Sequence, residues 1–330
     1  MSLARRHVLM ALAGALALGV AGLLLLTACG SSPAPVETSA PAKVTLQLNW
    51  FHEAEFAGYY VAAARGFYKA NGLNVDIREG GPGDPAVDYV VDKSATFAIS
   101  SFGELKDLVA QRKPVTAVMA AFQIPPLVIF SLAESGISKP ADLVEKRVGV
   151  TTDYWKGVLD ETLKAAGVDP STVKTVKVDA EDLQALYDHR VDAWLGYAQD
   201  EPIQADMAGH PVRAIFPADY GVGGYEGLVL VNDSTIKADP QLVRRFVRAS
   251  QQGWRYAVEH PDEAAQILLK WAPQPGLAFQ KLAVRAVGPL VDTPQAAIGW
   301  IDEVRWRHLM GAGYDRAHPG YTMTYAAPEP

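Results

Sequence analysis

From Lys43 onward, hydrophobic and polar positions follow two periods in turn. Val44-Thr45-Leu46-Gln47-Leu48 alternates apolar and polar residues, which is the period of a strand. The same reading predicts strands at 73–77, 95–99 and 115–122, and helices at 53–65, 67–71, 85–91 and 103–112. Strands that alternate with helices favour a parallel sheet covered by helices on both faces.

The pattern restarts after Ile137 and predicts a second α/β unit. Its expected strands are 147–150, 173–178, 191–197 and 212–216, and its expected helices are 154–166, 180–189 and 202–208. Residues 228–231 indicate a return to the first unit, followed by helices at 240–257, 262–271 and 294–310. The tail from Ala317 gives no interpretable pattern. We therefore expect lobe 1 at 43–130 plus 225–330, lobe 2 at 131–224, and a ligand cleft between them.

The N-terminal segment is different in kind. Arg5 and Arg6 precede residues 8–26, which carry no charge, and Leu26-Thr27-Ala28-Cys29 follows. This order is typical of an export signal. The last four residues resemble a bacterial lipobox, which implies removal of residues 1–28 and lipidation of Cys29. Residues 29–42 are rich in Ser, Pro and Ala and predict a flexible tether.

Two other interpretations of this segment stay open. The apolar run is nearly long enough for a retained membrane-spanning helix. Arg5-Arg6 could instead belong to a twin-arginine signal, although the flanking residues match one poorly. The lipobox interpretation places the protein on the extracytoplasmic face of the cell membrane.

Composition narrows the function classes. A net charge of −7 with 20% charged residues indicates an ordinary globular protein and gives no basic patch for nucleic acid. Cys29 is the only cysteine, so a disulfide or a cysteine zinc site within the body is excluded. We expect a monomer without metal or cofactor.

An ordered set of motifs resembles the NMT1/THI5-like solute-binding proteins. It opens with residues 48–62, LNWFHEAEFAGYYVA, and continues with Gly66-Phe67-Tyr68 and Gly80-Gly81-Pro82-Gly83. Residues 95–99, 146–150 and Glu201-Pro202 complete it. The resemblance implies an α/β type II periplasmic-binding-protein fold, with two lobes joined by a two-strand hinge.

The resemblance also implies a role as the binding component of an ABC transporter with a permease partner. The acidic and aromatic opening looks more like the vitamin branches of the family than the sulfonate branch. The expected ligand is riboflavin, with a thiamine-precursor aminopyrimidine as the alternative. Fungal relatives are pyrimidine-synthesising enzymes with a cysteine-rich motif, which this body lacks, so we expect no enzyme activity and no catalytic residue.

Candidate ligand-binding residues follow the predicted strands, because open α/β sheets bind ligands at the carboxyl ends of their strands. Aromatic residues suit a flat ring, and acidic or hydroxyl groups suit its polar edge. The set is Trp50, His52, Glu55, Tyr59, Gly80, Gly81, Ser100, Ser101, Tyr154, Trp155, Tyr197, Glu201 and Tyr225.

Structural alternatives accompany most of these residues. Trp50 could pack in the core, His52 could be structural, and the glycines could form a plain turn. Ser101 could cap a helix, and Glu53 is accounted for by the helix dipole. Of the consecutive pair Tyr59 and Tyr60, we expect one to line the cleft. A lipoprotein sensor that signals through a partner remains a further alternative function.

Overall fold

The computed structural model describes residues 40–179 and 182–326. The predicted signal, Cys29 and most of the predicted tether lie outside these residues. Within the described ranges, no helix is both long and apolar enough to cross a membrane.

The first sheet has five strands in the order β2-β1-β3-β10-β4. Its strands are β1 (Ala42–Gln47), β2 (Leu73–Arg78), β3 (Phe97–Ser100), β4 (Val115–Phe122) and β10 (Glu226–Asn232). β1 pairs in parallel with β2 and β3, whereas β10 pairs antiparallel with β3 and β4. The sheet is therefore mixed, and the purely parallel expectation was wrong because the returning strand inserts between two outgoing ones.

The second sheet also has five strands, in the order β7-β6-β8-β5-β9. They are β5 (Leu127–Leu132), β6 (Arg147–Val150), β7 (Lys174–Lys177), β8 (Ala193–Tyr197) and β9 (Val212–Ile215). β5 was not predicted, and it pairs antiparallel with β8 and β9. The lobe boundary drawn between residues 130 and 131 falls inside β5, so the first crossing lies earlier, at residues 123–126.

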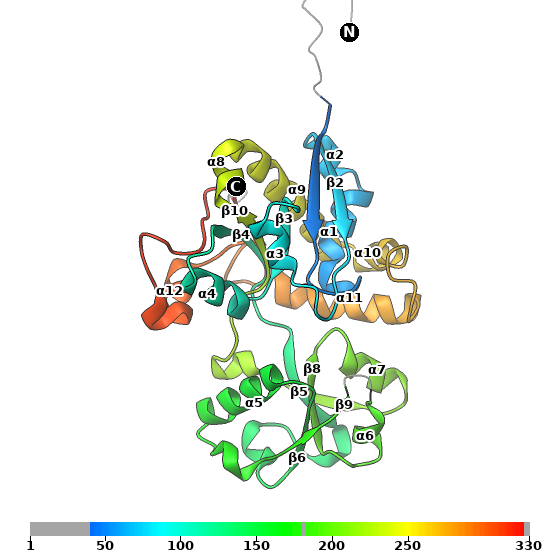
Figure 1. Ribbon diagram of the computed structural model, residues 1–330. Helices are drawn as coiled ribbons and strands as arrows, with labels where there is room; N and C mark the ends of the chain where they lie inside the picture. Colours follow the sequence, from blue (N-terminus) through cyan, green and yellow to red (C-terminus); the bar gives the residue numbers. More distant parts are fainter. Residues whose placement is uncertain (1–39, 180–181, 327–330) are drawn as a thin grey trace, which may run out of the picture. The chain divides into compact units, whose positions relative to one another are not determined.

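Helices cover the first sheet in two groups (Figure 1). One side carries α1 (Ala57–Ala64), α2 (Phe67–Ala70), α9 (Pro240–Glu259), α10 (Pro261–Leu268) and α11 (Leu277–Val291). The other side carries α3 (Ala86–Val91), α4 (Phe102–Ala110) and α12 (Glu303–Met310), with α8 (Asp233–Ala238) directly after β10. α11 was not predicted, and of the helix expected at 294–310 only α12 forms.

The contact between α1 and α9 depends on glycine. A Cβ at Gly58 would lie 2.2 Å from the Trp254 ring, and one at Gly253 would lie 2.1 Å from the Gly58 carbonyl oxygen. The two helices therefore approach closely enough to bury Trp254 completely. This packing fixes α1, and with it the loop that leads into α1 from β1.

The second lobe contains α5 (Asp153–Ala165), α6 (Gln184–Tyr187) and α7 (Glu201–Met207). Thr152 caps α5 through its hydroxyl, which accepts a hydrogen bond from the Trp155 amide. Ala198, Ile203 and Phe216 of this lobe pack against the core of the first lobe. The Thr152 cap therefore fixes the start of α5, and the contacts with the first lobe fix the residues after β8.

Strand directions define two ends of the first sheet. β1, β3 and β4 end on the side where the chain crosses to the second lobe, and β10 begins there. β1 and β4 begin at the opposite end, where β10 finishes and α8 starts. We call these the crossing end and the entry end, because the described chain enters at the latter (Figure 1).

Candidate functional site

Five carboxylates meet at the crossing end, from both lobes. Glu53 and Glu55 come from the loop before α1, Glu226 begins β10, and Asp200 and Glu201 follow β8. Glu53 lies within electrostatic reach of Glu55, Asp200 and Glu201, and Glu226 lies within reach of Glu55. We call Glu53, Glu55, Asp200, Glu201 and Glu226 the interlobe acid cluster.

Burial and mutual repulsion shift the titration of this cluster. Burial raises the pKa of Glu55 to about 7, and burial together with neighbouring Asp200 raises the pKa of Glu201 to about 7. Burial, reinforced by Glu55, raises the pKa values of Glu53 and Glu226 well above their ordinary range. No lysine or arginine among the described residues contributes to these shifts. Part of the cluster is therefore protonated at neutral pH and can donate as well as accept hydrogen bonds.

Glu201 is held by its own strand. Its Oε2 accepts a hydrogen bond of 2.8 Å from the Tyr197 amide. A Cβ at Gly196 would lie 2.5 Å from the same oxygen, so only glycine leaves room for the carboxylate at this point of β8. The strand end therefore positions Glu201 against the backbone, where the Tyr197 amide and its own amide donate to the carboxylate.

Aromatic rings from the second lobe stand beside the cluster. Trp155 makes edge contacts with Tyr154 and Tyr197 at centroid distances of 5.4 and 5.1 Å. Tyr154 is 48% exposed, whereas Trp155 is buried. Burial raises the pKa of both tyrosine hydroxyls, and Glu226 and Glu55 of the first lobe raise them further. The two tyrosines thus face the acids across the lobe boundary.

A hydroxyl joins the cluster from β3. The Ser100 Oγ donates a 2.7 Å hydrogen bond to Glu104, whose pKa is raised mainly by burial. Glu104 in turn lies within electrostatic reach of Glu226. Ser100 is therefore connected to the cluster through Glu104, and its hydroxyl is already engaged.

One buried amide next to the cluster has no partner. Gln199 is 2% exposed, and neither its side-chain oxygen nor its nitrogen is hydrogen-bonded within the described structure. A buried amide without partners is costly, commonly by about 1–3 kcal/mol for each lost group. Gln199 precedes Asp200 directly, so this unmet hydrogen-bonding capacity lies beside the acids.

Four of the candidate ligand-binding residues lie instead in the loops that follow β1 and β2. Trp50 is 42% exposed and meets Phe51 edge-on, and its carbonyl accepts the Gly80 amide. A Cβ at Gly80 would lie 2.3 Å from the Leu48 oxygen, and one at Gly81 would lie 3.0 Å from the Phe51 ring. The His52 Nδ1 is 2.9 Å from the Tyr60 hydroxyl, and its ring also packs against Trp271. Within the described part of the chain, no hydrogen bond or ring contact joins these side chains to the cluster.

Three candidates are structural in place. Tyr59 is fully buried against Trp254, and Tyr60 is fully buried as well, although both hydroxyls lie within electrostatic reach of Glu55. Tyr225 is buried under Arg305 and accepts the Asp302 amide. Ser101 caps α4 by accepting the Glu104 amide. These side chains are therefore part of the packing around α1 and β10.

The structure adds acids that sequence reasoning missed. Glu53 was assigned to the helix dipole, yet its side chain makes no capping hydrogen bond and lies near Glu55 instead. Glu226 stands at the beginning of a strand, so a search at the carboxyl ends of strands does not find it. It could have been found only by recognising that β10 is antiparallel.

The chemistry of the site follows from these groups. The carboxyl groups and the tyrosine hydroxyls can pair with N–H and O–H groups, and those acids of the cluster that are ionised disfavour anions. Within the described residues, no group of His, Cys, Asp or Glu side chains is arranged to hold a metal ion. The arrangement suits a neutral or weakly basic ligand with aromatic surface.

Comparisons with known proteins agree with the fold. The chain is 29% identical to the riboflavin-binding protein RibY of Chloroflexus aurantiacus, covering 88% of this chain and 89% of that protein. It is 30% identical to the formylaminopyrimidine-binding protein of Halalkalibacterium halodurans, covering 75% and 76%. It is 28% identical to a 4-amino-5-hydroxymethyl-2-methylpyrimidine phosphate synthase of Legionella pneumophila, covering 72% and 76%.

Among solved structures, the periplasmic aliphatic sulphonate binding protein SsuA of Escherichia coli superposes with a TM-score of 0.66 at 13% identity. The match covers 82% of this chain and 84% of SsuA, and it supports the periplasmic-binding-protein fold. The family model described as NMT1/THI5 like matches residues 53–264, which include every member of the interlobe acid cluster. The chain belongs to the NMT1/THI5 like family.

Proposed function

We propose that this chain is the solute-binding component of an ABC importer and that its ligand is riboflavin, bound between the two lobes. The observation that carries the proposal is the meeting of the interlobe acid cluster with Tyr154 and Tyr197 across the lobe boundary. Relatives named for binding a flavin and an aminopyrimidine support the same ligand class.

The acids favour a ligand that donates hydrogen bonds. Riboflavin offers an imide N–H and ribityl hydroxyls, and an aminopyrimidine offers an amino group. Glu201, Glu55 and the unpartnered Gln199 amide supply matching acceptors and donors. A phosphorylated ligand would bring a dianion toward these carboxylates without a compensating cation.

The aromatic groups favour the larger ring system. Tyr154 presents nearly half of its surface, and Trp155 and Tyr197 back it with edge contacts. A three-ring flavin covers more of this surface than a single pyrimidine ring does, and stacking adds about 0.5–1.5 kcal/mol per aromatic pair beyond area. The aminopyrimidine of the alternative proposal would leave more of it exposed.

Binding without catalysis is the favoured mode. Some relatives are named as synthases, but the body of this chain contains no cysteine. The acids that could transfer protons at the cluster are paired with backbone or with one another. Product formation from a pyrimidine precursor by the purified chain would contradict this point.

We further propose an anchor at Cys29 and delivery to a membrane permease. A doubly acylated cysteine holds a protein stably at the extracytoplasmic face. Cys29→Ser should release the chain from membranes and leave riboflavin affinity unchanged, measured by fractionation and by flavin fluorescence. A variant that stays in the membrane fraction would instead favour the retained helix.

The test of the ligand compares riboflavin with flavin mononucleotide. Binding should quench riboflavin fluorescence, with a Kd of about 1 µM or below. Flavin mononucleotide should bind at least about 30-fold more weakly than riboflavin. This factor corresponds to the repulsion between two like charges roughly 8 Å apart in a partly hydrated site. Equal affinities would overturn the role of the acids, and heat release with an aminopyrimidine but not with riboflavin would move the ligand to the alternative.

A further inference from the structure

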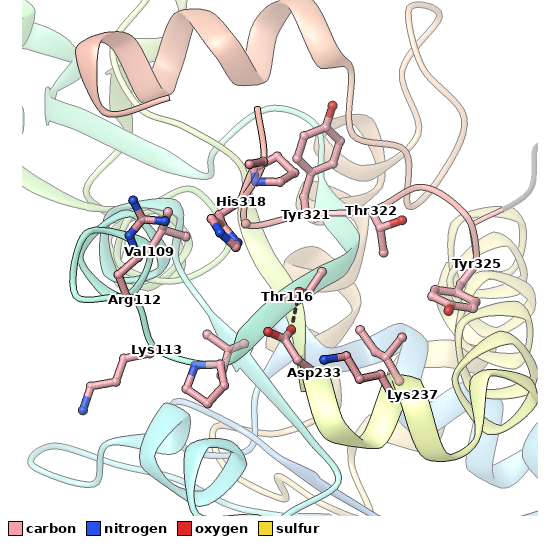
Figure 2. Close-up of a pocket in the computed structure, with 16 residues that line it drawn as sticks. Val109, Arg112, Lys113, Thr116, Asp233, Lys237, His318, Tyr321, Thr322 and Tyr325 are labelled. Carbon is pink, nitrogen blue, oxygen red and sulfur yellow. Dashed lines mark hydrogen bonds between the residues drawn. The ribbon is translucent and has the colours of Figure 1, made fainter. Parts of the chain in front are cut away.

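A cavity of about 500 Å³ lies at the entry end of the first sheet. It is bounded by the loop from α4 into β4, by α8, and by the C-terminal segment 317–325, whose pattern the sequence did not resolve (Figure 2). β4 separates it from the interlobe acid cluster by its whole length, about 20–25 Å. The two sites are therefore distinct.

The lining of this cavity is basic. Arg112, Lys113, Lys237 and His318 line it, and among the described residues Asp233 is the only carboxylate that does so. Arg112 and His318 stand on one side and Lys237 on the other (Figure 2). The Thr116 hydroxyl donates a 2.6 Å hydrogen bond to Asp233, so that carboxylate is partly satisfied. The cavity thus has the opposite charge to the interlobe acid cluster.

Neither lysine of the cavity is held in an ion pair within the described residues. Arg112 pairs with Asp315 at 3.2 Å, whereas Lys113 and Lys237 form no ion pair with any described residue. Both are exposed. Val115, Ile236 and the body of Tyr321 give the same cavity apolar surface. This combination suits a phosphate ester that carries an apolar body.

The place of the cavity suggests where such a group comes from. β1 begins at the entry end with Ala42, and exposed Lys43 and Lys93 lie at the same ends of β1 and β3. Residues 30–39 separate Cys29 from the described chain, and a segment of that length spans at most roughly 35–40 Å. With Cys29 lipidated, the cavity would stay within reach of the bilayer surface.

We propose that this cavity binds the phosphate headgroup of an anionic phospholipid in the membrane that carries the anchor. The inference rests on the proposed lipid anchor for its source of phosphate, but not on the proposed ligand. Seating the entry end on the bilayer directs the interlobe acid cluster away from the anionic surface, which would otherwise repel it.

The experiment uses the soluble chain beginning at Gly30, because residues Ala40–Pro330 form a compact unit separate from Met1–Ser39. Co-sedimentation is measured with phosphatidylglycerol–phosphatidylcholine vesicles and with pure phosphatidylcholine vesicles. The variant is Lys113→Gln/Lys237→Gln. The matched control is Lys164→Gln/Lys177→Gln, which removes the same charge from exposed positions of the second lobe.

The wild-type chain and the control should bind the anionic vesicles, and Lys113→Gln/Lys237→Gln should bind about tenfold or more weakly. Equal loss in both variants would reduce the effect to net charge and overturn the site. Absence of binding to anionic vesicles would overturn it as well. Riboflavin quenching by all three chains separates these outcomes from failure of the proposed function.

Discussion

The two ends of the first sheet use charge in opposite ways. At the crossing end, the interlobe acid cluster is partly enclosed by protein, and its pKa values rise because no lysine or arginine among the described residues offsets burial and repulsion. At the entry end, Lys113 and Lys237 are exposed beside a cavity and stay in contact with water. Enclosed charge selects a ligand by its protons and its sign, whereas exposed charge acts on a surface and is open to screening.

The largest expected effect comes from displacing one enclosed acid. Gly196→Ala places a Cβ where the Glu201 carboxylate now lies and breaks its bond to the Tyr197 amide. Riboflavin binding should weaken by about 1–3 kcal/mol in a fluorescence titration. Gly157→Ala in α5, where a Cβ meets nothing within 4 Å, is the control and should leave affinity unchanged.

Removing the exposed aromatic should cost less. Tyr154→Ala should weaken riboflavin binding by about 0.5–1.5 kcal/mol, since the ring stands in the open while its neighbours are packed. Tyr225→Phe removes the hydroxyl that accepts the Asp302 amide and should lower stability by about 1 kcal/mol without changing affinity. The reverse pattern would return Tyr225 to the ligand site and Tyr154 to a structural role.

The crossing end should also make stability depend on pH. The pKa values of Glu55 and Glu201 rise from 4.5 to about 7 on folding. The native state then binds more protons than the unfolded state between these values. The contribution is present below about pH 4.5 and is lost as the pH rises through about 7.

Urea unfolding at about pH 5 and about pH 8 measures this contribution. Glu55→Gln/Glu201→Gln should flatten the pH dependence by about 1 kcal/mol, because glutamine resembles the protonated acid and solvent screens part of the effect. Lys113→Gln/Lys237→Gln should keep the wild-type slope. If both double variants keep it, the interlobe acid cluster is not the source of the pH dependence.

Salt concentration should affect ligand binding at the two ends differently, and this effect should be smaller than those of the substitutions above. Raising ionic strength should weaken vesicle binding at the entry end, because exposed charges are screened within about 10 Å at 0.1 M. Riboflavin affinity should change less than about twofold over the same range, since the ligand is neutral. A steep salt dependence of riboflavin binding would show that long-range charge, rather than local hydrogen bonding, controls the crossing end.

Sequence periodicity predicted much of the fold, and its failures have physical causes. β4 was predicted with its observed bounds because an apolar run is framed by Pro114 and Gln123. β5 was missed because all of its residues are buried, so it shows no alternation. The segment before α12 has helix-like composition, but it forms isolated bridges instead, including Ala120 with Gly299.

The site was predictable in part for the same reasons. The rule of strand carboxyl ends led to Tyr197 and Glu201, which the structure places beside acids of the first lobe. It failed for Glu226, because the amino end of an antiparallel strand shares that edge of the sheet. Helix spacing alone does not reveal that α9 covers α1 and buries the Tyr59 ring against Trp254.

A crystal structure of the chain with riboflavin bound would show where the ligand lies. We expect the ring system between the lobes against Tyr154 and Tyr197, with a flavin N–H or ribityl hydroxyl within hydrogen-bonding distance of Glu201. Riboflavin found outside the lobe boundary, with the interlobe acid cluster contacting only water, would contradict this expectation.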